Sequence, residues 1–384
     1  MLVTLLRPGW AAVAALALAC VTWTGVSTSR PAVSAGAAVT TLQAPEGGRM
    51  PRAVVDTEGT VHLVYAGGGT DRADLFHVTR PPGAPNWSDP QRVNGRELSV
   101  SGVGPVDGAQ LAIGPGNRVH VVWLQAEPAR FVYAQSRSDG SGFAPPRELS
   151  TGDEGNLEAG PAVAVDAGGN VLVFWHAGAV EDARRSVYLT VSRDGGATFE
   201  PTRRVSPVEE GACACCALSA LSDPAGTVRV SYRAAGGNVQ RGQRLLTSTD
   251  AGRTFSDRLV HPWTLAACPV STTHLFGGLG GTTVAWETAG QVYFADLERL
   301  DAVRSPPGQA RFRRKNPVVA VDSRGDTLLA WGDGPGFAFG GSLHWQVFDS
   351  TGRPVGRAGG GPDMVLTGSI AAAVVQDDRF LVIY

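Results

Sequence analysis

The sequence predicts an all-β protein made of repeated antiparallel sheets, and three observations support this fold class. The 384 residues include 50 Gly and 25 Pro, a composition rich in turn formers. A short apolar strand ending in one aromatic residue recurs at spacings of roughly fifty residues. A second apolar strand and a tight turn precede each copy. Many short strands joined by turns are therefore expected.

The recurring aromatic residue marks the repeat unit. Seven copies are present: VHLVY ending at Tyr65, VHVVW at Trp123, VLVFW at Trp175, VRVSY at Tyr232, TTVAW at Trp286, TLLAW at Trp331 and FLVIY at Tyr384. We expect each aromatic side chain to be a wedge that packs between neighbouring sheets. The aromatic residues thus locate the units and say nothing about chemistry.

Each unit is predicted to be a four-stranded antiparallel meander. Its first two strands form a hairpin whose turn begins with an aspartate, as at Asp56, Asp166 and Asp322. Radial repetition of such sheets gives a single β-propeller, with seven blades favoured and six the alternative. The last unit stops at its second strand, and we expect residues 39–42 to complete that sheet from the N-terminal end, which removes a free edge.

The first 35 residues read as an export signal. Arg7 supplies a positive charge, and the apolar segment that follows is too short to span a bilayer. Two processing routes remain open: cleavage after the small residues that end at Ala35, or lipidation at Cys20, which closes a lipoprotein-like box. Residues 36–384 form the predicted propeller domain.

The remaining composition restricts the location and the partners. No later segment is apolar for long enough to be a transmembrane helix, so we expect the protein to act outside the cytoplasm, where it is secreted, periplasmic or lipid-anchored. The formal net charge of −2 gives no electrostatic basis for nucleic-acid binding. A monomer is expected.

A motif occurs in the turns between third and fourth strands. SRDGGATF spans residues 192–199, STDAGRTF spans residues 248–255, and a weaker form begins at Ser136. These segments resemble the Asp-box, or BNR repeat, of the sialidase (neuraminidase) superfamily. The positions that match its pattern are Ser192, Asp194, Gly196, Thr198, Phe199, Ser248, Asp250, Gly252, Thr254 and Phe255. The resemblance implies a propeller in which these turns lie away from the ligand, in enzymes and non-enzymes alike.

The candidate functional residues gather on the other face, which carries the loops between second and third strands and the connections between units. His176, Arg233 and Glu287 directly follow the repeated aromatic residue in units three to five. Arg233 and His176, with Arg244 further along, are candidates for binding an anionic substrate, and Glu287 for acting on a leaving group or nucleophile. The alternative is that polar residues simply begin solvated loops. Six loop arginines, at positions 184, 185, 241, 244, 313 and 314, are expected to be mostly solvated.

The sialidase resemblance also suggests catalytic roles near the N-terminus. Sialidases hold the substrate carboxylate with three arginines, and use a tyrosine nucleophile assisted by glutamate and an aspartate acid/base. Arg49-Met50-Pro51 is similar to the Arg-Ile-Pro motif of the first arginine, and Asp71 and Asp74 follow at a plausible distance for the acid/base. Six blades are usual in those enzymes, and no motif identifies the other arginines or the tyrosine.

The cysteines form the second unusual feature. Cys213, Cys215 and Cys216 lie in GACACCA and Cys268 in AACPV, just before the first strands of units four and five. Three interpretations remain open: a disulfide between Cys268 and one of the three, a thiolate site for zinc or a soft ion such as Cu(I), and a vicinal disulfide between Cys215 and Cys216. No other cofactor is expected.

Two functions fit these features. The first is an exo-sialidase-like glycoside hydrolase that acts on terminal sugars. The second is a non-catalytic propeller that binds a glycan or a protein, with the cysteines as a staple or a metal site. Convergence of three arginines on one point would distinguish the first function from the second.

Overall fold

The computed structural model of the chain describes residues 38–69, 71–101, 104–149, 157–178, 180–278, 280–310, 312–335, 340–363 and 371–384. In these ranges the regular secondary structure is strand, apart from three short 3-10 turns at Pro45–Gly47, Pro115–Asn117 and Asp182–Arg184. No helix in the described part of the chain is both long enough and apolar enough to cross a membrane. The predicted signal and Cys20 lie outside the described residues.

The first strands form two four-stranded meanders that share one nine-stranded sheet. The short strand β6 (Val100–Ser101) pairs with both β4 and β8 and thereby joins the two. The other members are β2 (Arg49–Val55), β3 (Val61–Gly68), β4 (Arg72–Arg80), β5 (Gln91–Arg92), β7 (Gln110–Gly114), β8 (Arg118–Gln125), β9 (Arg130–Gln135) and β10 (Arg147–Glu148).

Three further sheets have the predicted four antiparallel strands in sequential order. The first contains β11 (Ala162–Val165), β12 (Val171–Gly178), β13 (Arg185–Ser192) and β14 (Arg203–Arg204); the second β15 (Ser219–Ser222), β16 (Val228–Arg233), β17 (Gln243–Ser248) and β18 (Ser256–His261); the third β22 (Arg314–Val321), β23 (Thr327–Asp333), β24 (Ser342–Phe348) and β25 (Pro354–Asp363).

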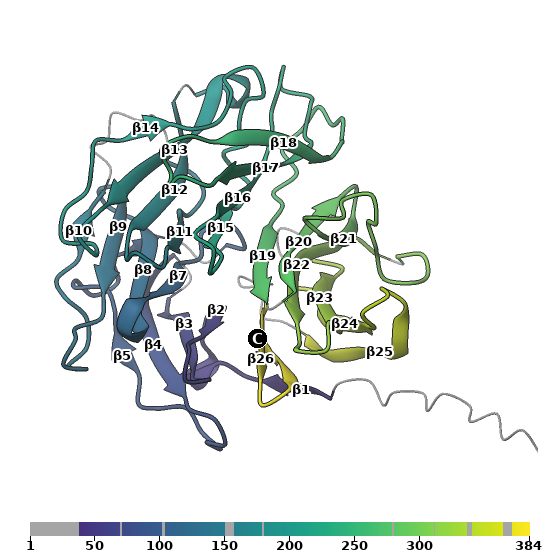
Figure 1. Cartoon of the computed structure of the whole chain (residues 1–384), viewed down its shortest axis with the longest axis horizontal. Coiled ribbons are helices and arrows are strands. Elements are labelled where there is room, and N and C mark those ends of the chain that lie inside the picture. The colour runs from purple at the N-terminus through teal and green to yellow at the C-terminus, as the bar shows by residue number, and fades with distance from the viewer. Residues whose placement is uncertain are drawn as a thin grey trace, which may run out of the picture. The chain divides into compact units, whose positions relative to one another are not determined.

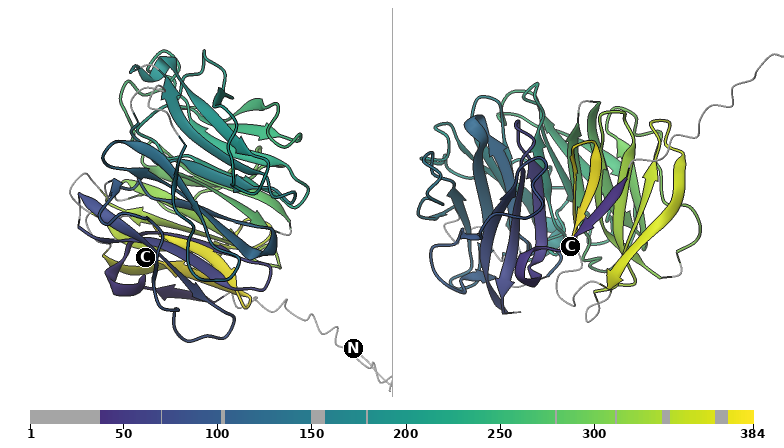
Figure 2. Two further views of the ribbon diagram at one scale, coloured as in Figure 1. Left: turned by 90° about the vertical axis from the view of Figure 1, so that its left-hand side faces the viewer. Right: turned by 90° about the horizontal axis from the view of Figure 1, so that it is seen from below.

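Two sheets have three strands. One contains β19 (Thr273–Gly278), β20 (Gly281–Thr288) and β21 (Gln291–Asp296), and a single bridge between Phe294 and Arg304 stands where a fourth strand would be. The other contains β26 (Ala372–Gln376), β27 (Arg379–Ile383) and β1 (Val39–Leu42), which pairs in parallel with β27. Figures 1 and 2 show β1 in purple beside the yellow C-terminal strands. The prediction that residues 39–42 complete the last sheet is confirmed.

The repeated aromatic residues are wedges between sheets, as predicted. Six of the seven are at most 3% exposed, and Tyr384 is half-buried. Trp175 packs among residues of β8 and β9 in the preceding sheet, and Trp286 packs likewise against Leu245 and Val260. Tyr65 lies in one cluster with Val374 and Ile383, so the N-terminal meander packs against the C-terminal sheet.

The first strands of the units lie next to one another. β2, β7, β11, β15, β19, β22 and β26 each contact two of the others, and β26 contacts β2. Together they line a cavity of about 320 Å³. Arg52 and His274 are among its polar lining residues, and burial lowers the pKa of Arg52 to about 10.

The motif turns contain the side-chain hydrogen bonds that their residue types predict. Ser192 Oγ accepts the backbone N–H of Gly196 at 2.7 Å, and Asp194 accepts both the N–H of Thr198 at 2.8 Å and its hydroxyl at 2.6 Å. The turn at residues 248–255 repeats these bonds. The hydrogen bonds from Thr198 lower the pKa of the Asp194 carboxyl to about 2.

We expect Asp194→Ala to lower the thermal unfolding midpoint at neutral pH. Because the carboxyl has a lower pKa in the folded chain than in the unfolded chain, its contribution is present above the unfolded value of about 3.9 and is lost as the pH falls toward about 2. Scanning calorimetry across this pH range should therefore show a deficit that shrinks with acidification. Asp301→Ala, at an exposed aspartate, is the control, and a deficit that does not change with pH would contradict the assignment.

Candidate functional site

The predicted loop face exists, although its loops differ from the expected ones. The loop expected at residues 67–73 is mostly strand, because β3 runs to Gly68 and β4 begins at Arg72. The longer connections lie around the third, fourth and fifth units. There the segments 205–218, 234–242 and 262–272 meet and bring the candidate residues together.

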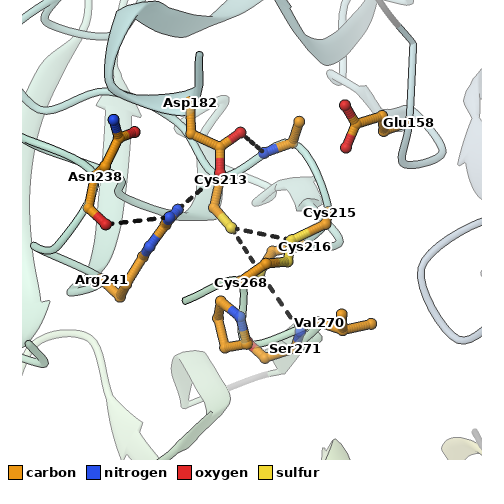
Figure 3. Close-up of a disulfide and its surroundings, with 12 residues drawn as sticks. Glu158, Asp182, Cys213, Cys215, Cys216, Asn238, Arg241, Cys268, Val270 and Ser271 are labelled. Atoms are coloured by element: carbon orange, nitrogen blue, oxygen red, sulfur yellow. Dashed lines mark hydrogen bonds and ion pairs between the residues drawn. A yellow bond between two sulfur atoms is a disulfide. The ribbon is translucent and has the colours of Figure 1, made fainter. Parts of the chain in front are cut away.

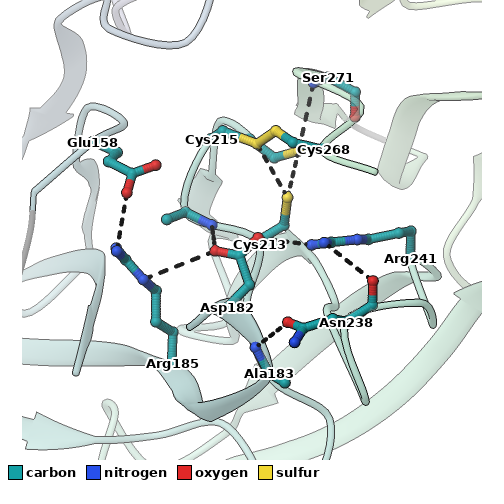
Figure 4. A network of polar contacts seen from close by, with 12 residues as sticks. Glu158, Asp182, Ala183, Arg185, Cys213, Cys215, Asn238, Arg241, Cys268 and Ser271 are labelled. Atoms are coloured by element: carbon teal, nitrogen blue, oxygen red, sulfur yellow. Dashed lines mark hydrogen bonds and ion pairs between the residues drawn. A yellow bond between two sulfur atoms is a disulfide. The ribbon is translucent and has the colours of Figure 1, made fainter. Parts of the chain in front are cut away.

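Asp182 is the centre of a polar network that joins its own loop to the segments 205–218 and 234–242 (Figure 4). Its carboxylate binds Arg241 at 2.9 Å and lies 3.8 Å from the Nε of Arg185, whose side chain also reaches Glu158 at 2.9 Å. Its backbone carbonyl accepts the N–H of Ala212 at 3.1 Å. The side chains of Arg185 and Arg241 are 1% and 5% exposed, so this carboxylate neutralises charge in a largely buried place.

The cysteine segment lies directly against this network (Figure 3). Cys215 and Cys268 form a disulfide that links the connection before β15 to the connection before β19. Cys213 and Cys216 are free and fully buried. The Sγ of Cys213 is 3.2 Å from that of Cys216 and 3.4 Å from that of Cys215. The structure thus contains the expected pairing of Cys268 with one of the three cysteines, and the vicinal Cys215–Cys216 bond is not formed.

The two free thiols have unequal acidity. Burial raises the pKa of the Cys216 thiol, but the hydrogen bond with Cys213 and the positive charge of Arg233 outweigh it, and the pKa falls to about 7. The pKa of Cys213 is raised by the same hydrogen bond and by burial. Cys216 is therefore the more acidic thiol of the pair.

Arg233 and Glu287 are neighbours, as predicted, but both are buried. Arg233 is 1% exposed and donates hydrogen bonds to the carbonyls of Arg241 and Glu287 and to the Oγ of Ser271. Its guanidinium also lies 5.2 Å from the ring centre of Trp263. Glu287 accepts the N–H of Gly290 at 2.9 Å through Oε1, whereas its buried Oε2 has no hydrogen-bond partner.

The other predicted substrate-binding arginines bind groups of the protein itself. Arg49 donates to the carbonyls of Gly68 and Gly69 at 2.8 and 2.6 Å. Arg244 binds Asp257, and it also binds Glu210 at 2.9 Å. Both arginines thus donate to groups of the chain itself.

The remaining candidates occupy separate places. Asp71 is exposed between β3 and β4. Asp74 accepts the N–H of Leu98 at 2.8 Å and thereby holds the connection between β5 and β6 against β4. His176 is 3% exposed, both its ring nitrogens lack hydrogen-bond partners, and burial together with the charge of Arg185 lowers its pKa to about 4. It is therefore neutral at physiological pH.

Sequence reasoning was wrong about the loop arginines and overlooked three residues. Of the six arginines expected to be mostly solvated, those at positions 185, 241 and 314 are buried, and the side chain of Arg244 is only 13% exposed. Asp182, Ser271 and Lys315 were not singled out. Cys213 and Cys216 also stand in C-x-x-C spacing, a signal that the interleaved Cys215 conceals.

Comparison with solved structures identifies the fold. A Dyadobacter fermentans protein of unknown function aligns at 14% identity and a TM-score of 0.50, covering 80% of this chain and 92% of that one. Trypanosoma rangeli sialidase, solved with the inhibitor DANA, aligns at 11% identity and 0.50, covering 74% of this chain but 52% of the sialidase. An Aleuria aurantia lectin aligns at 12% and 0.49, covering 83% and 95%.

The likeness to the sialidase, at a TM-score of 0.50, supports a sialidase-like propeller fold and nothing finer. No protein-family model and no curated protein sequence matches the chain. The chain corresponds to about half of the length of the sialidase (52%), whose catalytic activity therefore does not transfer with the fold.

Removing the carboxylate at the centre of the network should destabilise the protein. We expect Asp182→Ala to cost about 3–5 kcal/mol of unfolding free energy, because the buried guanidinium of Arg241 loses its counter-charge and that of Arg185 is left with Glu158. Urea denaturation would measure this cost, and faster alkylation of Cys213 and Cys216 by iodoacetamide would report loosening of the cysteine segment. The exposed Asp71→Ala is the matched control, and equal stabilities of the two variants would contradict the proposed role.

Proposed function

We propose that this protein is a non-catalytic, sialidase-like propeller that acts outside the cytoplasm and binds a glycan on its loop face. The observation that carries the proposal is the state of the arginines. Arg233, Arg244 and Arg49 each donate hydrogen bonds to carbonyl, hydroxyl or carboxylate groups of the chain itself. A sialidase needs such donors free to meet the carboxylate of its substrate.

The tyrosine chemistry of a sialidase is also not favoured by the contacts of Tyr232. Its hydroxyl donates to Asp257 at 3.0 Å, in a buried position. Burial and the negative charge of Asp257 raise the pKa of Tyr232, which is the opposite of what activates a nucleophile. Glu287 lies beside Arg233 and contacts no tyrosine in the described part of the chain.

Exposed apolar side chains support a binding role for the loop face. Six large hydrophobic residues of the described chain are exposed, and four of them lie in loops between second and third strands or in connections between units: Leu98, Val180, Val208 and Phe312. Exposed apolar groups on one face offer contacts to a partner. The fold likeness to sialidases makes carbohydrate the first ligand class to test.

We expect the purified exported protein to bind at least one sugar on a glycan array and to release no sialic acid from fluorogenic sialosides. Phe312→Asp or Val208→Asp should weaken binding by about tenfold or more, because a charge replaces an apolar contact. Leu259→Asp, at an exposed apolar residue of the outer strand β18, is the matched control and should bind normally.

Two outcomes would overturn this proposal. Release of sialic acid that Arg233→Ala or Glu287→Gln abolishes, in variants that still unfold cooperatively, would establish a hydrolase. Absence of binding to every glycan, with intact folding, would remove carbohydrate as the ligand and leave a protein partner as the alternative function of this face.

We also propose that the sheets close into a ring of seven blades. The cyclic contacts of the seven first strands, and the packing of Tyr65 against the C-terminal sheet, support this count. In such a ring β1 and β27 fasten the two ends of the chain, since Ala44 N–H also donates to the carbonyl of Tyr384 at 2.8 Å.

Deleting residues 38–44 should therefore destabilise the whole ring in one cooperative step. The unpaired edge of β27 would be exposed, and opening there would uncover the apolar surface between the first and last units. We expect calorimetry to show one transition at a lower temperature. Two separate transitions, with only the C-terminal unit melting early, would argue against closure.

A further inference from the structure

We infer that Cys213, Cys215, Cys216 and Cys268 form a thiolate site for one Cu(I) ion, available when the Cys215–Cys268 disulfide is reduced. This site is independent of glycan binding. It rests on the convergence of four sulfur atoms from two segments of the chain that are 53 residues apart.

The sulfur positions suit a metal. The Sγ atoms of Cys213, Cys215 and Cys216 all lie within 4.8 Å of one another, with individual separations of 3.2 and 3.4 Å. Ligands about 2.3 Å from one ion stand roughly 3.8 Å apart in a tetrahedral site. Small side-chain adjustments would therefore bring the thiolates onto one ion, and the backbone places Cys268 beside them, with its Cα 6.7 Å from that of Cys215.

The surroundings favour negatively charged ligands. Arg233 and Lys315 both lie close enough to Cys216 for electrostatic attraction, and Arg241 is similarly placed toward Cys213. The backbone N–H of Ser271 points at the Sγ of Cys216 from 3.5 Å. Such outer contacts hold thiolates in position and offset the excess charge of a thiolate–metal centre.

The four cysteines differ in burial, and the exposed side of the site is where an ion could enter. Cys213 and Cys216 are at most 1% exposed, Cys215 is half-buried, and Cys268 is exposed. An ion would thus enter past Cys268 and end among sulfur atoms shielded from water. Thiolate sulfur is a soft ligand, and it selects Cu(I) over harder ions such as Mg²⁺ and Ca²⁺.

The redox step balances with an external dithiol. Two electrons and two protons pass from the dithiol to the Cys215–Cys268 bond, which becomes two thiols, while the dithiol becomes a disulfide. Binding of Cu(I) then replaces thiol protons, which leave to solvent. The oxidised form keeps only Cys213 and Cys216 as free ligands.

The test uses the exported protein under anaerobic conditions. The disulfide is reduced with a phosphine, which takes up one oxygen atom from water and leaves two thiols, and the phosphine is then removed. Cu(I) is supplied as its coloured bicinchoninate complex, so that transfer to the protein is read as loss of colour. We expect the reduced protein to take up one equivalent, and Cys213→Ser with Cys216→Ser to weaken uptake by ~100-fold or more.

Two controls keep the result interpretable. Ser219→Ala, at a buried serine in the adjacent strand β15, should bind as the unchanged protein does. In the unchanged protein, bound Cu(I) should also protect Cys213 and Cys216 from iodoacetamide, which tests the site even if the cysteine variants fail to fold.

Three results would overturn the assignment. These are no uptake by the reduced protein, uptake that survives loss of both buried cysteines, and uptake of Zn(II) with exclusion of Cu(I). Equal uptake by the oxidised and reduced forms would refute the dependence on the disulfide.

Discussion

The fold depends on one constraint: a four-stranded sheet with two apolar faces must be covered on both sides. A small sheet of this kind cannot bury both faces by itself, so each unit must pack between two others. The aromatic residue at the end of each second strand is where that packing is tightest, as with Trp175 and Trp286, both fully buried against the preceding sheet. The first and last sheets can then be covered only if they pack against each other. Tyr65 makes this contact with Val374 and Ile383.

This constraint separates the scaffold from the face that carries function. The sheets are fixed by packing and by short turns such as that of Asp194, whereas the loops at the other end are free to differ between units. In this chain the loops around units three to five bury polar groups. Asp182 holds three of them together, so the candidate site is part of the folded core and not a flexible edge.

The sequence predicted what is local and repetitive. Alternating apolar residues, turn aspartates and the terminal aromatic residue each depend on neighbours within about ten positions, so strands, hairpins and wedges could be inferred from periodicity. The site depends on pairs far apart in the chain. Arg241 binds Asp182, which is 59 positions away in the sequence. Such long-range contacts determine whether an arginine is solvated or buried, which is why the exposure of the loop arginines was wrongly predicted.

The charge balance around Arg233 links the buried arginine to the cysteines. Its hydrogen bonds go to neutral acceptors, the carbonyls of Arg241 and Glu287 and the hydroxyl of Ser271, and its Nε has no hydrogen-bond partner among the described residues, although the group is fully buried and positively charged. A buried charge is costly unless an opposite charge lies near it. The strongest attraction it experiences is to Cys216, followed by the carboxylate of Glu287. Arg233 is thus placed to favour the ionised form of Cys216, and a thiolate is the ligand that a soft metal ion requires.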